Sequence, residues 1–137
     1  MQTAQTAIDA LKSAGIQPSA QRLAVANYVL FTDEHPSADR VFARAKKSLP
    51  MLSRATVYNT LNLFVERGLL RELMIAQGNV VFDPNVGPHH HLVDASTGRI
   101  HDIPWEALEV KRVERLKGFD VHDYQVLLTG RPRPRAR

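Results

Sequence analysis

The stretch that decides the fold is SRATVYNTLNLFVERG, residues 53–68. Ser53 stands where a helix needs an N-cap, and Gly68 is the residue type that most often follows the end of a helix. The apolar residues recur at helical spacing and predict a buried stripe made of Val57, Leu61, Phe64 and Val65. The opposite side carries a tyrosine and two asparagines in place of better helix formers. This side is therefore expected to do something other than stabilise the helix.

Three further helices are predicted before this stretch, each marked by capping residues, prolines or glycines. They cover residues 6–14, ending at Gly15, a segment opened by Pro18 and Ser19, and a segment opened by Pro36 and Ser37 and stopped by Pro50. After the last helix, LLRELMIAQGNVVFD at residues 69–83 holds two β-prone runs around a turn at Gln77, Gly78 and Asn79. Helices followed by such a hairpin predict a winged helix-turn-helix over residues 1–82, whose last helix enters the major groove of DNA.

The exposed side of residues 53–68 offers groups that read base edges. Arg can form two hydrogen bonds with guanine, Asn can form two with adenine, and an aromatic ring can contact the thymine methyl. The candidates for base contacts are Arg54, Thr56, Tyr58, Asn59 and Asn62, and those for phosphate contacts are Arg22 and Arg71. An ordinary surface helix with Tyr58 partly buried is the alternative. Charge favours DNA, since residues 1–82 hold nine Lys and Arg against six Asp and Glu, whereas residues 83–130 hold five against eight.

Length and composition limit the remaining possibilities. A chain of 137 residues with 44% hydrophobic and 23% charged residues predicts one ordinary domain or two small ones. No run approaches the roughly 20 apolar residues of a membrane span, and residues 1–15 lack the features of a secretion signal, so a cytoplasmic protein without a membrane partner is expected. The sequence has no cysteine, which excludes disulfides, thiolate catalysis and thiolate-bound zinc. Any metal must be held by His, Asp or Glu.

The second half begins with a linker, DPNVGP, at residues 83–88. Beyond it the predicted elements are strands at residues 89–94 and 98–104, a helix from Pro104 through Leu116, and a third strand at residues 119–130. This β-β-α-β unit, residues 89–130, is too small for a generous core, so it is expected to form a homodimer. The predicted fold class is α+β, an N-terminal winged helix-turn-helix followed by a small β-β-α-β dimerisation domain. Residues 131–137, RPRPRAR, are expected to form a disordered basic tail that lies near phosphates or only aids solubility.

Histidines gather at the start of this second half. Side chains alternate across a strand, so His89 and His91 share one face with Asp102 of the next strand, while His90 and His101 share the other. Two imidazoles at i and i+2 beside a carboxylate suit divalent iron, manganese or zinc. The alternative is an exposed histidine loop without a metal. The carboxylate at strand spacing favours the metal site.

This arrangement resembles the ferric uptake regulator superfamily over nearly the whole chain. The resemblance rests on the string from Ser53 to Leu61, the hairpin with an acidic linker, the His-rich strand, and the ending Leu127-Leu128-Thr129-Gly130. It implies a dimeric, metal-dependent repressor that binds double-stranded operator DNA. It also implies a regulatory metal held between the two domains by His35, Asp83, His89, His91 and Asp102. Metal binding would restrict the linker at residues 83–88 and fix the separation of the two recognition helices of a dimer.

The chain also departs from the family. Many members hold a structural zinc with four cysteines, and here Asp94 and Thr97 stand where the first pair would be, so that zinc is absent. Members with a second metal site use the opposite face of the His strand and the following helix. By that resemblance, a second metal or haem site would involve His90, His101, Glu109 and His122.

The branch of the family stays open between two alternatives. Asp at both carboxylate positions, Asp83 and Asp102, together with Asn59, resembles the peroxide-sensing repressors, in which bound ferrous iron reacts with peroxide. The cysteine-free His-His-His strand also resembles the iron response regulators, which bind haem. Asp102 favours the peroxide-sensing branch, with Fe²⁺ or Mn²⁺ as the expected metal and Zn²⁺ or haem as alternatives.

Two rivals come from other functional classes. One is a small metalloenzyme that uses the three His and two Asp, although five protein ligands leave little open coordination for a substrate. The other is a winged helix used only for protein contacts, which would show no salt-dependent affinity for DNA. We expect a regulator rather than an enzyme, with no catalytic residues.

Overall fold

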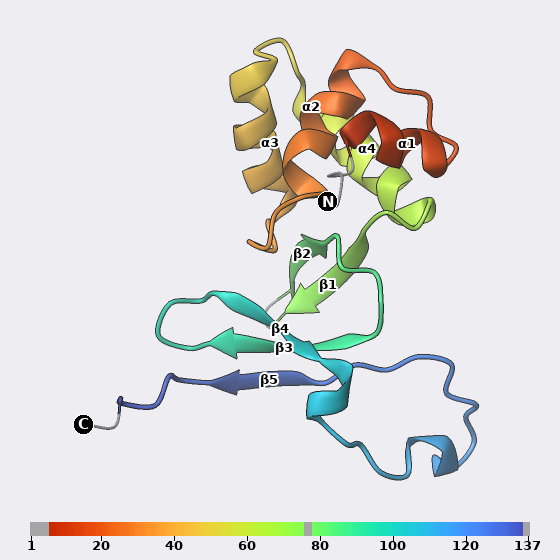
Figure 1. Cartoon of the computed structure of the whole chain (residues 1–137), viewed down its shortest axis with the longest axis vertical. Coiled ribbons are helices and arrows are strands. Elements are labelled where there is room, and N and C mark those ends of the chain that lie inside the picture. Colours follow the sequence, from red (N-terminus) through yellow and green to blue (C-terminus); the bar gives the residue numbers. More distant parts are fainter. Residues whose placement is uncertain (1–5, 76–77, 136–137) are drawn as a thin grey trace, which may run out of the picture. The chain divides into compact units, whose positions relative to one another are not determined.

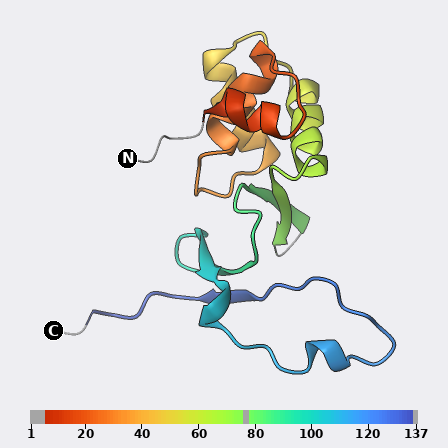
Figure 2. The same cartoon turned by 45° about the vertical axis from the view of Figure 1, so that its right-hand side comes forward.

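The structure is a computed structural model that describes residues 6–75 and 78–135. This part of the chain contains both helices and sheets, four α-helices and five strands, as the α+β prediction requires. It divides into two compact units, the first ending at Val86 and the second beginning at Gly87. All four α-helices belong to the first unit, whereas the second consists of strands, short turns and irregular segments (Figure 1 and Figure 2).

Each helix of the first unit begins at a hydroxyl side chain. The helices are α1 (Ala7–Ser13), α2 (Ala20–Val29), α3 (Ala38–Ser48) and α4 (Arg54–Glu66). Their N-caps are Thr6, Ser19, Ser37 and Ser53, and each hydroxyl accepts a hydrogen bond from the backbone N–H three residues further on. These bonds satisfy donors that the first helical turn leaves open. The four predicted helices are confirmed.

The core of the first unit lies among these helices. Its fully buried members come from all four of them and include Leu11, Val25, Val29, Val41, Val57, Leu61 and Phe64. Three of them, Val57, Leu61 and Phe64, belong to the apolar stripe predicted for residues 53–68, whereas the fourth predicted member, Val65, is half-buried. Because packing of such a face supplies most of the stability of a helix in a protein, this core orients α4 and leaves its polar side exposed.

A hairpin completes the first unit. Strands β1 (Arg71–Ile75) and β2 (Asn79–Asp83) pair antiparallel, with Arg71 opposite Asp83. Gln77 of the predicted turn lies outside the described residues. The N–H of Phe82 donates to the carbonyl of Pro36 at 2.9 Å, which ties β2 to the segment before α3.

The second unit is a three-stranded sheet with the order β4-β3-β5. Its strands are β3 (His89–Asp94), β4 (Ile100–Pro104) and β5 (Leu127–Gly130). Strand β3 is central, antiparallel to β4 and parallel to β5. The first two strands match the prediction, and the histidine-bearing strand is hydrogen-bonded on both sides.

The predicted helix from Pro104 through Leu116 is wrong. The segment forms only two short 3₁₀ turns, η2 (Trp105–Ala107) and η3 (Val113–Arg115), and Arg112 between them has a φ of 69°, outside the helical range. None of residues 104–116 is buried. A helix of this length is marginal in water unless one face is packed, and this segment has no buried face.

The third predicted strand, residues 119–130, is correct only at its end. Pairing with β3 starts at Leu127, opposite His91, and residues 119–126 have no regular structure. The N–H of Val126 donates to the imidazole Nδ1 of His90 at 2.9 Å instead of to a strand carbonyl. Asp120 and Asp123 are also poor strand formers. Within the described residues, no helix is long and apolar enough to cross a membrane.

Candidate functional site

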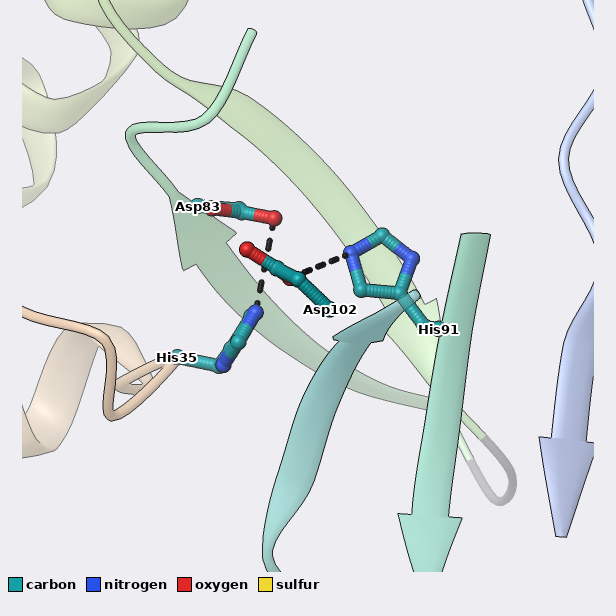
Figure 3. A group of neighbouring side chains, drawn as sticks. All are labelled: His35, Asp83, His91 and Asp102. Atoms are coloured by element: carbon teal, nitrogen blue, oxygen red, sulfur yellow. Dashed lines mark ion pairs between the residues drawn. The ribbon is translucent and has the colours of Figure 1, made fainter. Parts of the chain in front are cut away.

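Three ligand-type atoms converge on one face of the second unit. Strand pairing places His91 opposite Asp102, and His89 shares their face. The Nε2 atoms of His89 and His91 lie 3.0 Å apart, and Oδ1 of Asp102 lies 3.4 Å and 3.5 Å from them. Both imidazoles are buried, whereas the carboxylate is 34% exposed. Figure 3 shows the ring of His91 facing the carboxylate of Asp102.

The spacing of this triangle fits a metal ion. Bonds of about 2.0–2.2 Å from a metal to nitrogen and oxygen place neighbouring ligand atoms roughly 3 Å apart. Nδ1 of His89 lies 2.7 Å from the carbonyl of Gly87. When Nδ1 carries the proton, Nε2 of the neutral ring keeps a free lone pair, and this lone pair faces Nε2 of His91 and Oδ1 of Asp102. Two imidazoles and a carboxylate form a donor set suited to divalent iron, manganese or zinc.

A second His/Asp pair lies in the first unit. Nε2 of His35 is 3.4 Å from Oδ2 of Asp83, and both side chains are buried (Figure 3). Oδ1 of Asp83 accepts a hydrogen bond from the N–H of Asn85 at 2.9 Å, which orients the carboxylate. His35 has a φ of 50°, a left-handed conformation that costs energy in a residue with a side chain. The pair offers one nitrogen and one oxygen ligand.

A cluster around Glu34 holds the loop that precedes His35. The carboxylate of Glu34 accepts hydrogen bonds from the hydroxyls of Tyr28, at 3.0 Å, and Thr32, at 3.2 Å, and it pairs with Arg40 and Arg44. The hydrogen bond from Tyr28 is the main cause that lowers the pKa of Glu34, and burial raises the pKa of Tyr28. The cluster therefore carries a charged carboxylate at neutral pH.

His90, a candidate for a second metal or haem site, has a packed environment. Its side chain is buried, and its ring stacks on Trp105 with centroids 4.7 Å apart and an interplanar angle of 13°. Trp105 in turn contacts Tyr124 at 4.8 Å between ring centroids. The other candidates of this set are exposed: His101, Glu109 and His122. Among the described residues, no group with the spacing of metal ligands includes any of these four side chains.

The polar side of α4 is exposed. Its exposed members are Arg54, Tyr58, Asn59 and Asn62, and Tyr58 is 42% exposed. Thr56 is half-buried, and its hydroxyl accepts a hydrogen bond from that of Ser53 at 2.9 Å. Thr56 thus takes part in the cap of α4.

The two arginines that the sequence suggests as phosphate contacts are both half-buried. Arg22 donates through Nη1 to the carbonyl of Gln17 at 2.8 Å, and Arg71 lies at the start of β1. In the first unit, Tyr58 and Asn62 also line a hollow of about 660 Å³ together with Asp39 and residues of the hairpin.

Two structurally important side chains were not found by sequence reasoning. Asp39 bonds to both Arg54 and Tyr58 on the exposed side of α4, but the sequence marks it only as an acid in the first turn of a helix. Trp105 stacks on His90, although its position suggested a helix N-terminus. A solitary tryptophan beside a histidine strand was the available signal for the second contact, and no sequence signal indicates the first.

Comparison with known proteins gives consistent matches. The model of the ferric uptake regulator family matches residues 13–129. The peroxide-responsive repressor PerR of Staphylococcus aureus strain Mu50 is 30% identical over 128 residues, which cover 92% of this chain and 86% of that protein.

Solved structures match over similar lengths. A zinc-bound manganese uptake regulator superposes with a TM-score of 0.73 at 26% identity, covering 93% of this chain and 99% of the other. The ferric uptake regulator of Pseudomonas aeruginosa with manganese gives a TM-score of 0.70 at 25% identity, covering 95% and 100%.

Proposed function

Because the chain belongs to the ferric uptake regulator family, we propose that it is a repressor that binds operator DNA as a homodimer when it holds a divalent metal ion. Proteins of this family are metal-responsive transcription regulators and not enzymes. This excludes the small His/Asp metalloenzyme.

The first unit is the DNA-binding domain, in the form of a winged helix-turn-helix. Helix α4 is the recognition helix and the β1–β2 hairpin is the wing. The exposed polar side of α4 supports this assignment, because Tyr and Asn lower helix propensity without adding to the core. Base contacts are assigned to Arg54, Tyr58, Asn59 and Asn62, with Thr56 in a lesser role and Arg22 and Arg71 near the phosphates.

The regulatory metal is held by His89, His91 and Asp102 of the second unit together with His35 and Asp83 of the first. The observation that carries this proposal is the triangle of Nε2, Nε2 and Oδ1 atoms with sides of 3.0, 3.4 and 3.5 Å. The three imidazoles and two carboxylates would hold the ion, which would supply positive charge that compensates the two carboxylates. Fe²⁺ and Mn²⁺ fit this mixed nitrogen and oxygen set best, and Zn²⁺ is permitted.

The ligands would couple the ion to DNA binding through the linker. His35 and Asp83 precede residues 84–88, whereas the other three ligands follow them. When one ion engages both sets, the linker loses most of its freedom, so the two recognition helices of a dimer keep one separation. Coupling of this kind is reciprocal, and operator DNA should tighten metal binding by the same factor.

Dimerisation is assigned to the second unit, residues 89–130. Several large apolar side chains are exposed there: Leu116, Phe119, Val121 and Leu127. A small unit with such a surface gains stability by burying it against a second copy. Four arginines in residues 131–137 add positive charge after the last strand.

Peroxide is the proposed signal. The Staphylococcus aureus relative is named a peroxide-responsive repressor, and this chain has Asp at both carboxylate positions of the proposed site, Asp83 and Asp102. The absence of cysteine excludes a thiol sensor, and the resemblance to the peroxide-sensing repressors implies that a histidine ligand of bound ferrous iron is the group oxidised. The haem-binding alternative is less well supported, because His90 is buried and stacked on Trp105.

A titration of operator binding tests the function. Metal-free protein is titrated with Fe²⁺, Mn²⁺, Zn²⁺ or haem, and the measurement is repeated after exposure to peroxide. We expect affinity to rise with Fe²⁺ or Mn²⁺ and to fall after peroxide only for the iron form. The operator is first selected from random duplexes with the Mn²⁺-loaded protein.

Two variants make the test specific to the proposed site. His91→Ala should lose metal-dependent operator binding, whereas His122→Ala, which removes an exposed histidine of the same unit, should behave as wild type. Metal-dependent binding that survives in His91→Ala would contradict the proposed site. Metal-independent binding by the wild type would contradict the proposed regulation.

A further inference from the structure

One carboxylate contacts two side chains of the exposed side of α4. Asp39 lies in the first turn of α3, and its Oδ1 atom bonds to Nη1 of Arg54 and accepts the hydroxyl hydrogen bond of Tyr58 at 3.1 Å. Arg54 and Tyr58 are four residues apart and therefore lie one turn apart on the same side of the helix. A single oxygen thus links two candidate base contacts.

Stability does not account for this arrangement. The side chains of Arg54 and Asp39 are 59% and 68% exposed, and exposed ion pairs contribute only about 0–1 kcal/mol. The contacts do fix the directions in which the side chains of Arg54 and Tyr58 point. The guanidinium of Arg54 also lies over the ring of Phe42, 4.9 Å from its centroid, so it is held from two sides.

The hydrogen bond to Asp39 also determines what Tyr58 can offer to DNA. An ionised carboxylate only accepts hydrogen bonds, so the hydroxyl proton of Tyr58 points toward Asp39 and the oxygen lone pairs remain for other partners. In the major groove, adenine and cytosine present amino donors, whereas guanine N7 and O6 and thymine O4 are acceptors. A Tyr58 held in this way can accept from an amino group but cannot donate to an acceptor.

We propose that Asp39 is a specificity-determining positioning residue, which makes Tyr58 select a base with an amino donor, adenine or cytosine, over guanine or thymine at the position that it contacts, and keeps Arg54 directed across the start of α4. The pairing with Arg54 also offsets a negative charge that would repel the DNA phosphates. This inference rests on the proposed function, in which α4 reads DNA.

The test compares base preference rather than affinity alone. An operator is selected from random duplexes with the full-length, Mn²⁺-loaded wild type. Each adenine in it is then replaced by purine and each cytosine by pyrimidin-2-one, which lack the amino group, and affinities are measured for the wild type and for Asp39→Ala, Asp39→Asn and Tyr58→Phe. The control is Asp9→Asn, which removes the same charge from the first turn of α1.

For the wild type we expect one base in each half-site whose loss of the amino group weakens binding about 3- to 10-fold, the effect of one hydrogen bond, and whose penalty is absent in Tyr58→Phe. Penalties that persist in Tyr58→Phe belong to other contacts, such as those of Asn59 and Asn62. In Asp39→Ala the penalty that depends on Tyr58 should disappear while affinity for random DNA is retained. In Asp39→Asn, whose amide oxygen can still accept from Tyr58, part of the penalty should return. Asp9→Asn should match the wild type.

Three results would overturn the inference. The first is an unchanged penalty at that base in Asp39→Ala, and the second is the absence of any base whose penalty depends on Tyr58. The third is a further loss of discrimination when Asp39→Ala is added to Tyr58→Phe, because Asp39 would then not act through Tyr58. Failure of the wild type to select any sequence contradicts the proposed function instead. Circular dichroism of each variant verifies that the exposed substitutions leave the fold intact.

Discussion

Replacing His90 with alanine should destabilise the second unit and leave the metal content unchanged. The substitution removes the acceptor for the Val126 N–H, a bond of 2.9 Å that contributes about 1 kcal/mol. It also removes the stack on Trp105, a contribution of about 1 kcal/mol. His90 is only 1% exposed, so a cavity adds a further cost of about 1–2 kcal/mol. We expect a total loss of about 3–4 kcal/mol.

A graded variant separates these contributions. In His90→Asn, the amide oxygen can take the place of Nδ1 as an acceptor but cannot stack, so the expected loss is about 1–2 kcal/mol. The exposed His101 provides the control, and His101→Ala should change stability by no more than about 0.5 kcal/mol.

The assay is urea unfolding of the metal-free protein at one fixed protein concentration. Trp105 is the only tryptophan of the sequence, so its fluorescence reports on the second unit alone. Metal analysis of the reloaded protein completes the measurement. An unchanged urea midpoint in His90→Ala, accompanied by the loss of bound metal or haem, would refute the structural role assigned to His90.

Two further predictions concern carboxylates of the second unit. Hydrogen bonds from the hydroxyl and backbone N–H of Ser96 lower the pKa of Asp94 in the folded protein. The ionised carboxylate therefore stabilises the fold fully above the ordinary Asp pKa of about 3.9, and this stabilisation is lost as the pH falls through the lower pKa of the folded state. Asp94→Asn should therefore unfold at lower urea than the wild type at pH 7, with a difference that shrinks below about pH 4; a pH-independent difference would contradict this. Asp102→Glu should keep metal-dependent repression but weaken the response to peroxide, because the longer side chain displaces the carboxylate from the two imidazoles. If the peroxide concentration that releases the variant from DNA equals that of the wild type, Asp102 does not have the proposed role in peroxide sensing.

The helices of the first unit could be predicted because their signals are local. A hydroxyl residue, an apolar period and a stop residue stand together in the sequence, as at Ser53 and Gly68, and the caps form within three residues. Alternation along β3 and β4 likewise placed His91 and Asp102 on one face, since strand geometry follows from a period of two.

The segment from Pro104 to Val126 could not be predicted in this way. Its apolar residues fit a helix, but residues 104–116 bury none of their side chains, and whether a face will be covered is not a local property. The link between Asp39 and Tyr58 spans 19 positions and depends on how α3 packs against α4. Such contacts arise from tertiary packing, which the spacing of residues within one helix does not reveal.

The central position of β3 has a consequence for selectivity among ions. His91 is paired along both edges of this strand and His89 along the β4 edge, so both belong to the central, least deformable strand of the sheet. Little rearrangement is then needed at these two imidazoles when an ion arrives or departs. Discrimination by size and preferred geometry should consequently depend on the other two proposed donors, His35 in the loop before α3 and Asp83 at the end of β2. Amide hydrogen exchange should be slow in β3 whether or not an ion is bound.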